Sequence, residues 1–177
     1  MRLLKRFITG LLALIVVLAG VAFLLPREVS VARTIQIDAP PEAVFGHVDN
    51  LQAFAEWSPW GALDPDMSQS FSGPERGVGN RMEWQSEAAN VGSGTQEIVA
   101  VKENEAVETA LDFGPMGTAD AQWLLAAKEG GTEVTWAFQT DMGMNPISRY
   151  MGLMMDGWVG ADYEKGLANL KARVEGS

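Results

Sequence analysis

The stretch Ala106-Val-Glu-Thr-Ala-Leu-Asp-Phe113 alternates apolar and polar side chains, the period-two pattern of a strand with one buried face. The stretches 119–126 (ADAQWLLA) and 132–139 (TEVTWAFQ) repeat this pattern, and only the short segments 114–117 and 128–131 separate the three. Connections this short join antiparallel neighbours, because a parallel crossover needs about a dozen residues or more. We therefore expect a meander of antiparallel hairpins at the centre of the fold.

Further strands are predicted before this meander, at residues 30–38, 81–85 and 95–102. From residue 81 onward, apolar and aromatic side chains gather on one face, while acids and amides occupy the other. The sheet therefore has one buried and one hydrated face. The buried face is predicted to comprise Met82, Trp84, Val107, Thr109, Leu111, Phe113, Ala121, Trp123, Leu125, Val134, Trp136 and Phe138.

Helical patterns precede and follow the strands. Ala39-Pro-Pro-Glu42 is a helix start, because proline is tolerated in the first turn and an acid there complements the helix dipole. From Pro146 to about Val174, apolar residues recur at helical spacing and predict one long C-terminal helix. Its several glycines predict a kink or a close approach to the sheet. A long helix on a curved antiparallel sheet buries both apolar faces, so the expected class is α+β.

The N-terminus has the pattern of a membrane span. Three basic residues lie within the first six, and residues 7–25 then contain no charge. A helix of that length spans roughly 28 Å, close to the hydrocarbon thickness of a bilayer. The basic residues before the span favour a cytoplasmic N-terminus. The alternative is a cleaved signal peptide, for which Gly20-Val21-Ala22 would supply the small-residue cleavage site, although its apolar region is usually shorter.

These patterns divide the chain into a signal-anchor or transmembrane helix at residues 1–27 and a folded domain at residues 28–177. The domain is expected on the periplasmic or extracellular side of the membrane, or secreted if the signal is cleaved. Residues 28–177 hold nine of the 13 basic residues and all 23 acidic ones, a net charge of −14. Such a field repels nucleic acid, so a nucleic-acid partner is not expected. The absence of cysteine excludes disulfides and thiolate ligands.

Five motifs, in this order, resemble the SRPBCC superfamily (START-like, polyketide cyclase/dehydrase-type). They are Ile37-Asp-Ala-Pro-Pro-Glu-Ala-Val-Phe45, Trp57-Ser-Pro-Trp60, Gly73-Pro-Glu-Arg-Gly77-Val-Gly79 leading to Trp84, Gly131-Thr-Glu-Val-Thr-Trp136, and Asp162-Tyr-Glu-Lys-Gly-Leu-Ala-Asn-Leu-Lys171. The resemblance implies a helix-grip fold, in which a curved antiparallel sheet wraps around a long C-terminal helix. It also implies a cavity between sheet and helix that holds an apolar or amphipathic small molecule, and no cofactor. A minority of such proteins catalyse cyclisation or dehydration.

Large, soft side chains on the strand face and the C-terminal helix are the candidates for lining this cavity. For any single residue, ordinary core packing is the competing interpretation. The predicted cavity residues are Trp84, Phe113, Trp123, Trp136, Phe138, Met151, Met154, Met155 and Trp158. Trp57 and Trp60 follow the first helical region, where they would pack, gate the cavity or touch the membrane interface.

Catalytic residues are less evident. His47 is the only histidine and hence the only candidate general base with a pKa near neutrality. A structural, partly buried histidine is the alternative. A catalytic role would pair it with a cavity-facing carboxylate or with Tyr163. A second histidine is missing, so a two-histidine metal site cannot form, and Asp64-Pro-Asp66 fits a surface turn better than a pair of metal ligands.

The sequence thus predicts a membrane-tethered domain that binds an apolar or amphipathic small molecule, lipid-like or polyketide-like. One alternative is a cyclase/dehydrase-type enzyme that uses the same cavity. A second alternative is a protein-interaction domain whose hydrophobic groove accepts a helix of a partner.

Overall fold

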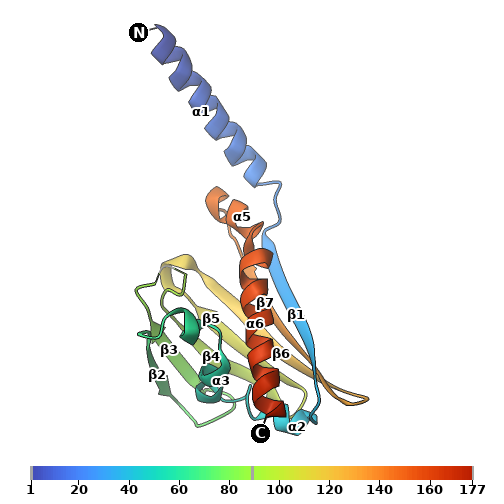
Figure 1. Cartoon of the computed structure of the whole chain (residues 1–177). Helices are drawn as coiled ribbons and strands as arrows, with labels where there is room; N and C mark the ends of the chain where they lie inside the picture. The colour runs from blue at the N-terminus through green and yellow to red at the C-terminus, as the bar shows by residue number, and fades with distance from the viewer. Residues whose placement is uncertain (1, 89, 177) are drawn as a thin grey trace.

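The computed structural model describes residues 2–88 and 90–176 of the chain. Helix α1 (Arg2–Ala22) projects away from a single sheet-and-helix body (Figure 1). The other helical elements are α2 (Pro41–Phe45), α3 (Leu51–Trp57), α4 (Trp60–Leu63), the 3-10 turn η1 (Gly114–Met116), α5 (Pro146–Gly152) and α6 (Met155–Glu175). The strands are β1 (Glu28–Ile37), β2 (Ser68–Ser72), β3 (Arg81–Gln85), β4 (Gly94–Lys102), β5 (Ala106–Asp112), β6 (Thr118–Lys128) and β7 (Gly131–Asp141).

The seven strands form one antiparallel sheet in the order β1-β7-β6-β5-β4-β3-β2. Strands β2 to β7 follow one another as a meander, and β1 closes the sheet beside β7. The predicted antiparallel meander and the α+β class are therefore confirmed. The register places Val31, Phe138, Ala121 and Thr109 in one row across the sheet, and Arg33, Trp136, Trp123 and Val107 in the next row.

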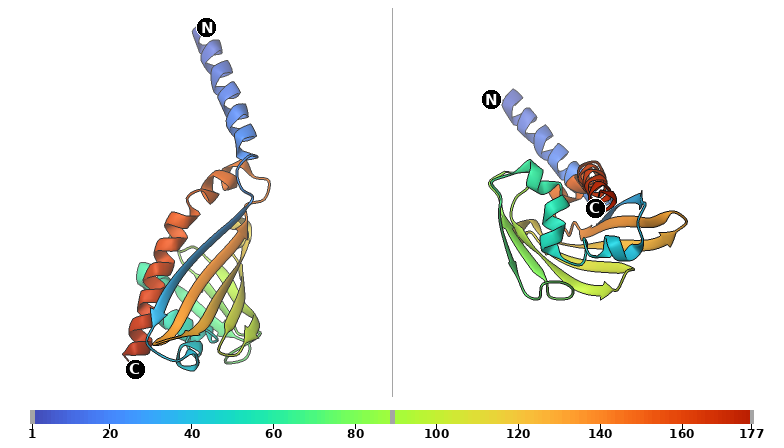
Figure 2. Two further views of the ribbon diagram at one scale, coloured as in Figure 1. Left: turned by 90° about the vertical axis from the view of Figure 1, so that its right-hand side faces the viewer. Right: turned by 60° about the horizontal axis from the view of Figure 1, so that its bottom comes forward.

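One face of the sheet is buried, as the alternation predicts. We call this buried face the inner face. The long strands β6 and β7 alternate between buried and more exposed side chains along most of their length. Helix α6 lies over the β1 side of this face, α2 contacts β6 and β7 near the C-terminal end of α6, and α3 lies toward β3 (Figures 1 and 2). The outer face carries the acids and amides, including Glu83, Glu108 and Asp112.

Helix α6 lies close to the sheet because of two glycines. A Cβ at Gly160 would stand 2.1 Å from Nη2 of Arg33, and one at Gly166 would stand 2.7 Å from Cζ3 of Trp136. The Arg33 guanidinium passes beneath Gly160 and forms ion pairs with Asp156 at 2.9 Å and with Glu164 at 2.6 Å. These two acids flank Gly160 by one turn on each side, so the arginine holds the helix where the glycine lets it approach.

The predicted single C-terminal helix is wrong in one respect, because the structure breaks it into α5 and α6. The break lies at Leu153 and Met154, where the amide of Leu153 donates to the carbonyl of Tyr150, a tight three-residue turn. Gly152 packs against β1, and a Cβ there would lie 2.9 Å from Cγ2 of Val29. This contact and the bonds of α5 to α1 turn α5 away from the axis of α6.

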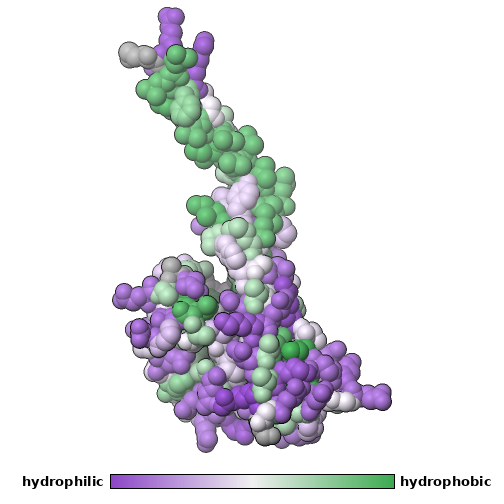
Figure 3. Space-filling view, viewed as in Figure 1, coloured by the Kyte–Doolittle hydropathy of each residue, from purple (hydrophilic) through white to green (hydrophobic). Residues whose placement is uncertain are grey.

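Helix α1 is almost wholly exposed, and beyond the basic residues of its first turns its surface is apolar (Figure 3). It is the only helix in the described residues long and apolar enough to cross a membrane, by length and composition. Its last turn is not free of the domain, because Ala22 is fully buried and α5 lies beside it (Figures 1 and 2).

Two glycines of α6 provide a matched test of this packing. Gly166→Ala is expected to lower the free energy of unfolding by about 1–3 kcal/mol, because the new methyl group would overlap Trp136 and press on Pro59. Gly157→Ala meets no atom within 4 Å and should raise it by up to about 1 kcal/mol through helix propensity. Thermal unfolding of both full-length variants in mild detergent measures the pair. Equal effects would contradict the close approach of α6.

Candidate functional site

The centre of the inner face is a packed aromatic cluster. Trp136 stacks on Tyr163 of α6, with ring centroids 3.8 Å apart and planes 9° apart. Its other neighbours are Trp123 at 5.6 Å and the edges of Phe54 and Trp57 at 5.7 and 5.4 Å. We call Val107, Trp123, Val134 and Trp136 the packed centre; none is more than 1% exposed. These aromatic rings fill the space between sheet, α3 and α6.

The packed centre leaves two polar groups unpaired. The indole Nε1–H groups of Trp123 and Trp136 are buried and have no hydrogen-bond acceptor among the described residues. Leaving a buried donor without an acceptor costs roughly 1–3 kcal/mol. An oxygen atom of a bound molecule that reached this depth would find two donors on adjacent rings.

The inner face changes character toward α1. There Trp84, Ala119, Ala121 and Phe138 are buried but keep 4–8% of their exposure. Trp84 meets Phe113 edge to face, with centroids 5.8 Å apart. Met155 at the start of α6 packs on the same core. We call the set Trp84, Phe113, Ala119, Ala121 and Phe138 the α1 end of the inner face.

Small and polar side chains distinguish this end from the packed centre. On the inner face of β6, two small residues, Ala121 and then Ala119, follow Trp123 in the direction of α1. Beside them, the buried Gln96 donates through Nε2 to Oγ1 of Thr109 at 3.1 Å, and that hydroxyl donates to the carbonyl of Ala121 at 3.3 Å. The site is therefore an aromatic rim around small residues with one internally satisfied polar pair. Strand alternation placed Ala121 on the buried face, but neither alanine nor Gln96 was among the predicted cavity residues.

The predicted cavity residues separate into three groups. Trp84, Phe113, Phe138 and Met155 lie at or beside the α1 end of the inner face, and Trp123 and Trp136 lie in the packed centre. Met151, Met154 and Trp158 do not lie between sheet and helix, since they are 46, 47 and 51% exposed. The break between α5 and α6 turns Met151 and Met154 outward, and Trp158 lies on the side of α6 opposite the buried Leu167.

The proposed gate residues are held in place. Trp57 is 3% exposed, and its indole N–H donates to the carbonyl of His47 at 2.9 Å, so it is a fixed part of the core rather than a lid. Trp60 is half-buried and meets Trp136 edge to face at 5.7 Å. Of the two, Trp60 retains access to solvent.

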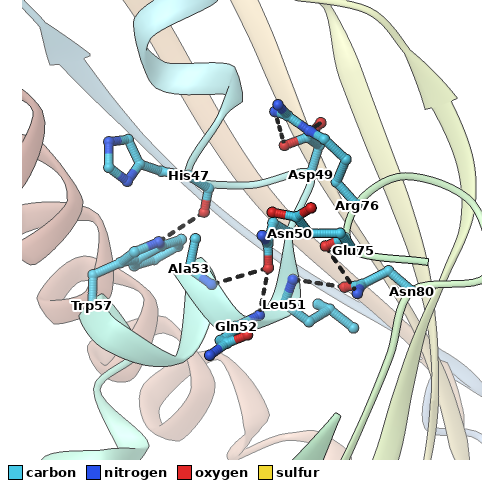
Figure 4. A network of polar contacts seen from close by, with 10 residues as sticks. All are labelled: His47, Asp49, Asn50, Leu51, Gln52, Ala53, Trp57, Glu75, Arg76 and Asn80. Carbon is cyan, nitrogen blue, oxygen red and sulfur yellow. Dashed lines mark hydrogen bonds and ion pairs between the residues drawn. The ribbon is translucent and has the colours of Figure 1, made fainter. Parts of the chain in front are cut away.

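A polar network positions α3 over the inner face (Figure 4). Oδ1 of Asn50 accepts the amides of Gln52 and Ala53, which is the preferred side-chain cap of a helix start. Oδ1 of the buried Asn80 accepts the amide of Leu51 at 2.8 Å, and its Nδ2 donates to the carbonyl of Pro74 in the glycine-rich loop. The same network includes a two-bond ion pair of Asp49 with Arg76, at 2.7 and 2.8 Å.

His47 lies outside the aromatic cluster. In Figure 4 its imidazole points away from the polar network, and the charge of Arg173, near the C-terminal end of α6, acts on it. Tyr163 lies ten residues earlier in α6, about 15 Å along the helix. Burial raises the pKa of the Tyr163 hydroxyl well above its usual value of about 10. The predicted partnership of His47 with Tyr163 is therefore not formed.

Two surface hollows have acidic residues in their linings. One, of about 600 Å³, lies beside β2 and β3 and includes Asp64, Asp66 and Glu87. The amide of Asp66 donates to Oδ1 of Asp64, as expected for a turn. The other, of about 420 Å³, involves β1, β5, β6 and β7, and its lining is mixed, since it includes the outer-face acids Glu108 and Asp120 as well as Val31, Ala121 and Phe138. Among the described residues, no group of three or more His, Asp or Glu side chains could hold a metal ion.

The fold and the site now allow comparison with known proteins. The sequence profile of a family described as "Polyketide cyclase / dehydrase and lipid transport" matches residues 28–175. The chain belongs to this family. Its members include proteins that bind hydrophobic ligands, which agrees with an aromatic face buried between sheet and helix. Among curated proteins, no sequence matches the chain.

Solved structures share the fold of this cyclase/dehydrase and lipid transport family member. Ara h 8.0201 superposes with a TM-score of 0.60 at 15% identity, over 85% of this chain and 99% of the other. An uncharacterised protein from Rhizobium leguminosarum gives 0.59 at 18% identity, over 85% and 96%. The di-domain ARO/CYC BexL from the BE-7585A biosynthetic pathway gives 0.60 at 16% identity, over 84% of this chain and 50% of that chain. At these identities the likeness concerns the fold, and it confirms the helix-grip arrangement.

His47 provides a pH test. Burial, and second the charge of Arg173, hold the pKa of His47 below its ordinary value of about 6.5. A depressed pKa means that the folded state favours the neutral ring, so this contribution to stability is present above about pH 6.5 and is lost as the pH falls. The melting temperature should therefore drop between about pH 7.5 and 5.5, and less so in His47→Gln. An NMR titration of this single imidazole with a midpoint above 6.5 would contradict the placement.

Asn80 provides a second test of how α3 is positioned. Asn80→Ala leaves the buried amide of Leu51 without its acceptor and should cost about 1–3 kcal/mol of unfolding free energy. Asn90→Ala, at an exposed position, is the matched control and should change stability by less than about 0.5 kcal/mol. Urea or thermal unfolding distinguishes the two, and an equally small effect at both positions would show that Asn80 does not hold α3.

Proposed function

We propose that this chain is a membrane-tethered binding domain for an apolar or amphipathic small molecule, with the α1 end of the inner face as the binding surface. The observation that carries the proposal is the contrast along the inner face. At the packed centre the side chains are large and no more than 1% exposed, whereas at the α1 end small alanines lie beside aromatic rings, and Ala121 and Phe138 line a hollow of about 420 Å³. Ligand pockets are typically apolar with a few placed polar groups.

The ligand would lie with its apolar body against Trp84, Phe113 and Phe138, and its deeper end would face Trp123 and Trp136. A carbonyl or hydroxyl oxygen at that deeper end would accept from an indole N–H that has no partner in the protein. Amphipathic molecules with an oxygen on a hydrocarbon or fused-ring body, lipid-like or polyketide-like, meet this description. Binding alone accounts for these features, because His47 lies outside the cluster.

We also propose that α1 remains attached and tethers residues 28–177 to the membrane. The support comes from the contacts of its last turns. Ala22, the last residue of the alternative cleavage site, is fully buried, and the hydroxyl of Tyr150 donates to the carbonyl of Leu18 at 2.8 Å. Cleavage after Ala22 would remove the Leu18 acceptor and expose the surface that Ala22 covers. The intact mass of protein purified from membranes tests this directly, since cleavage would shorten the chain by 22 residues.

Filling the space beside Ala121 tests the binding surface. Native mass spectrometry of the full-length protein is expected to show a co-purifying apolar molecule. Ala121→Phe should remove it, because the ring would occupy the place of the ligand. Ala126→Phe, on the exposed side of the same strand, is the matched control and should retain it.

Overpacking at position 121 costs roughly 1–3 kcal/mol, so circular dichroism must show that the variant is folded. Ala121→Leu is the milder substitution and should weaken binding at least about tenfold, equivalent to 1.4 kcal/mol. Retention of the molecule in folded Ala121→Phe would overturn the assignment of the site. Release by both Phe variants would mean that the loss does not report the space beside Ala121, and it would also overturn the assignment.

A further inference from the structure

An exposed apolar surface lies where the folded domain meets α1. It consists of Met144, Ile147, Met151, Leu153, Met154 and Trp158, which are between 46 and 70% exposed. We call this set the junction surface. It appears as a hydrophobic region at the base of α1, above a largely hydrophilic domain (Figure 3). Exposed apolar patches on a soluble face are uncommon and mark a surface that contacts a partner or a membrane.

The charge pattern of this segment differs from that of the rest of the domain. Residues 142–155 contain one charged side chain, Arg149, in a domain with a net charge of −14. Arg149 does not face outward, since it is 6% exposed and its guanidinium donates to the carbonyls of Gly143 and Leu25, each at 2.7 Å. The one acid in the stretch that carries the junction surface, the exposed Asp156, is paired with Arg33 at 2.9 Å, so the junction surface presents no unpaired charge.

The position of α5 along α1 fixes the depth of the junction surface. Arg149 bonds to Leu25, the last residue of the uncharged stretch, and Tyr150 bonds to Leu18, seven residues earlier. Leu18 lies four residues, about 6 Å, before the end of α1 at Ala22, so α5 lies beside the last turns of the apolar helix. Amphipathic segments at a membrane interface are buried about 5–10 Å, and tyrosine and tryptophan are enriched at that depth.

We propose that the junction surface enters the outer leaflet of the bilayer that α1 spans and seats the domain on it. The inference rests on the proposed tether. Its occupant is lipid rather than a protein, because the junction surface continues the apolar surface of α1 at a depth where hydrocarbon surrounds the helix. The contact is hydrophobic and not electrostatic, because Arg27, the exposed basic residue that follows the uncharged stretch 7–25, is paired with Asp141 at 2.6 Å.

Seating the domain in this way has a consequence for ligand entry. The break between α5 and α6 leaves Met151 and Met154 facing outward. The next residue, Met155, packs at the α1 end of the inner face. Lipid contact at the junction surface would place the binding surface next to the bilayer. An apolar ligand would then pass between membrane and domain without crossing open water.

The absence of native cysteine allows a direct test with single environment-sensitive labels. The full-length protein carries an NBD label at Ile147→Cys, Met151→Cys, Val16→Cys or Val99→Cys and is reconstituted in phosphatidylcholine vesicles. Val99 on β4 is the matched control, since it is 47% exposed against 46% for Met151. Labels at positions 16, 147 and 151 should show blue-shifted emission and loss of iodide quenching, whereas the label at Val99 should remain quenched.

Three results would contradict the proposal in different ways. Protection at Val16 with quenching at Ile147 and Met151 would overturn membrane seating but leave the tether intact. Quenching at Val16 would overturn the tether and the seating with it. Protection at Ile147 and Met151 that disappears when the lipid-to-protein ratio is raised would assign the junction surface to a second copy of the chain. Protection that persists on dilution supports contact with lipid.

Discussion

The close approach of α6 to the β1 side of the sheet is the contact on which the rest of the domain depends. Gly160 and Gly166 permit it, and Arg33 secures it through Asp156 and Glu164. Because α6 lies to one side of the inner face, α2 and α3 must cover the rest of that face. The network around Asn80 holds α3 in place. The packed centre forms where these two covers meet. Toward α1 the inner face is slightly less buried, and the small residues Ala119 and Ala121 keep 6 and 4% of their exposure.

The uneven cover of the inner face fits a family whose members include proteins that bind hydrophobic molecules. On this one face, the packed centre is sealed and the α1 end is less completely buried. The unpaired indole groups belong to the packed centre. The α1 end of the inner face is also the end at which the chain meets its apolar N-terminal helix, so the proposed binding surface, the junction surface and the proposed tether occupy one end of the molecule. The acidic outer face carries the charge that keeps the rest of the domain hydrated.

Much of this architecture could be predicted from local patterns. Alternation over 106–139 placed the strands, their faces and their antiparallel order, because a side chain in a strand can point only to one face or the other. Helical periodicity was less informative between Pro146 and Val174. It identified an apolar stripe, but Ile147, Met151 and Trp158 on that stripe are exposed while Leu167 and Leu170 are buried. Periodicity reports which residues share a helix face and does not report what covers that face.

The sequence by itself determined the apolar N-terminal helix, the buried and hydrated faces of the sheet, and the family of the folded domain. The first two follow from runs and periods within a few residues of one another, and the family follows from the resemblance of five motifs along the chain. Only the tertiary structure decided that α5 turns away from α6 to meet α1, that Trp123 and Trp136 are packed against each other, and that His47 lies apart from Tyr163. Each of these depends on where α6 crosses the sheet, and that position is set by contacts such as Arg33 with Glu164, whose partners are 131 residues apart.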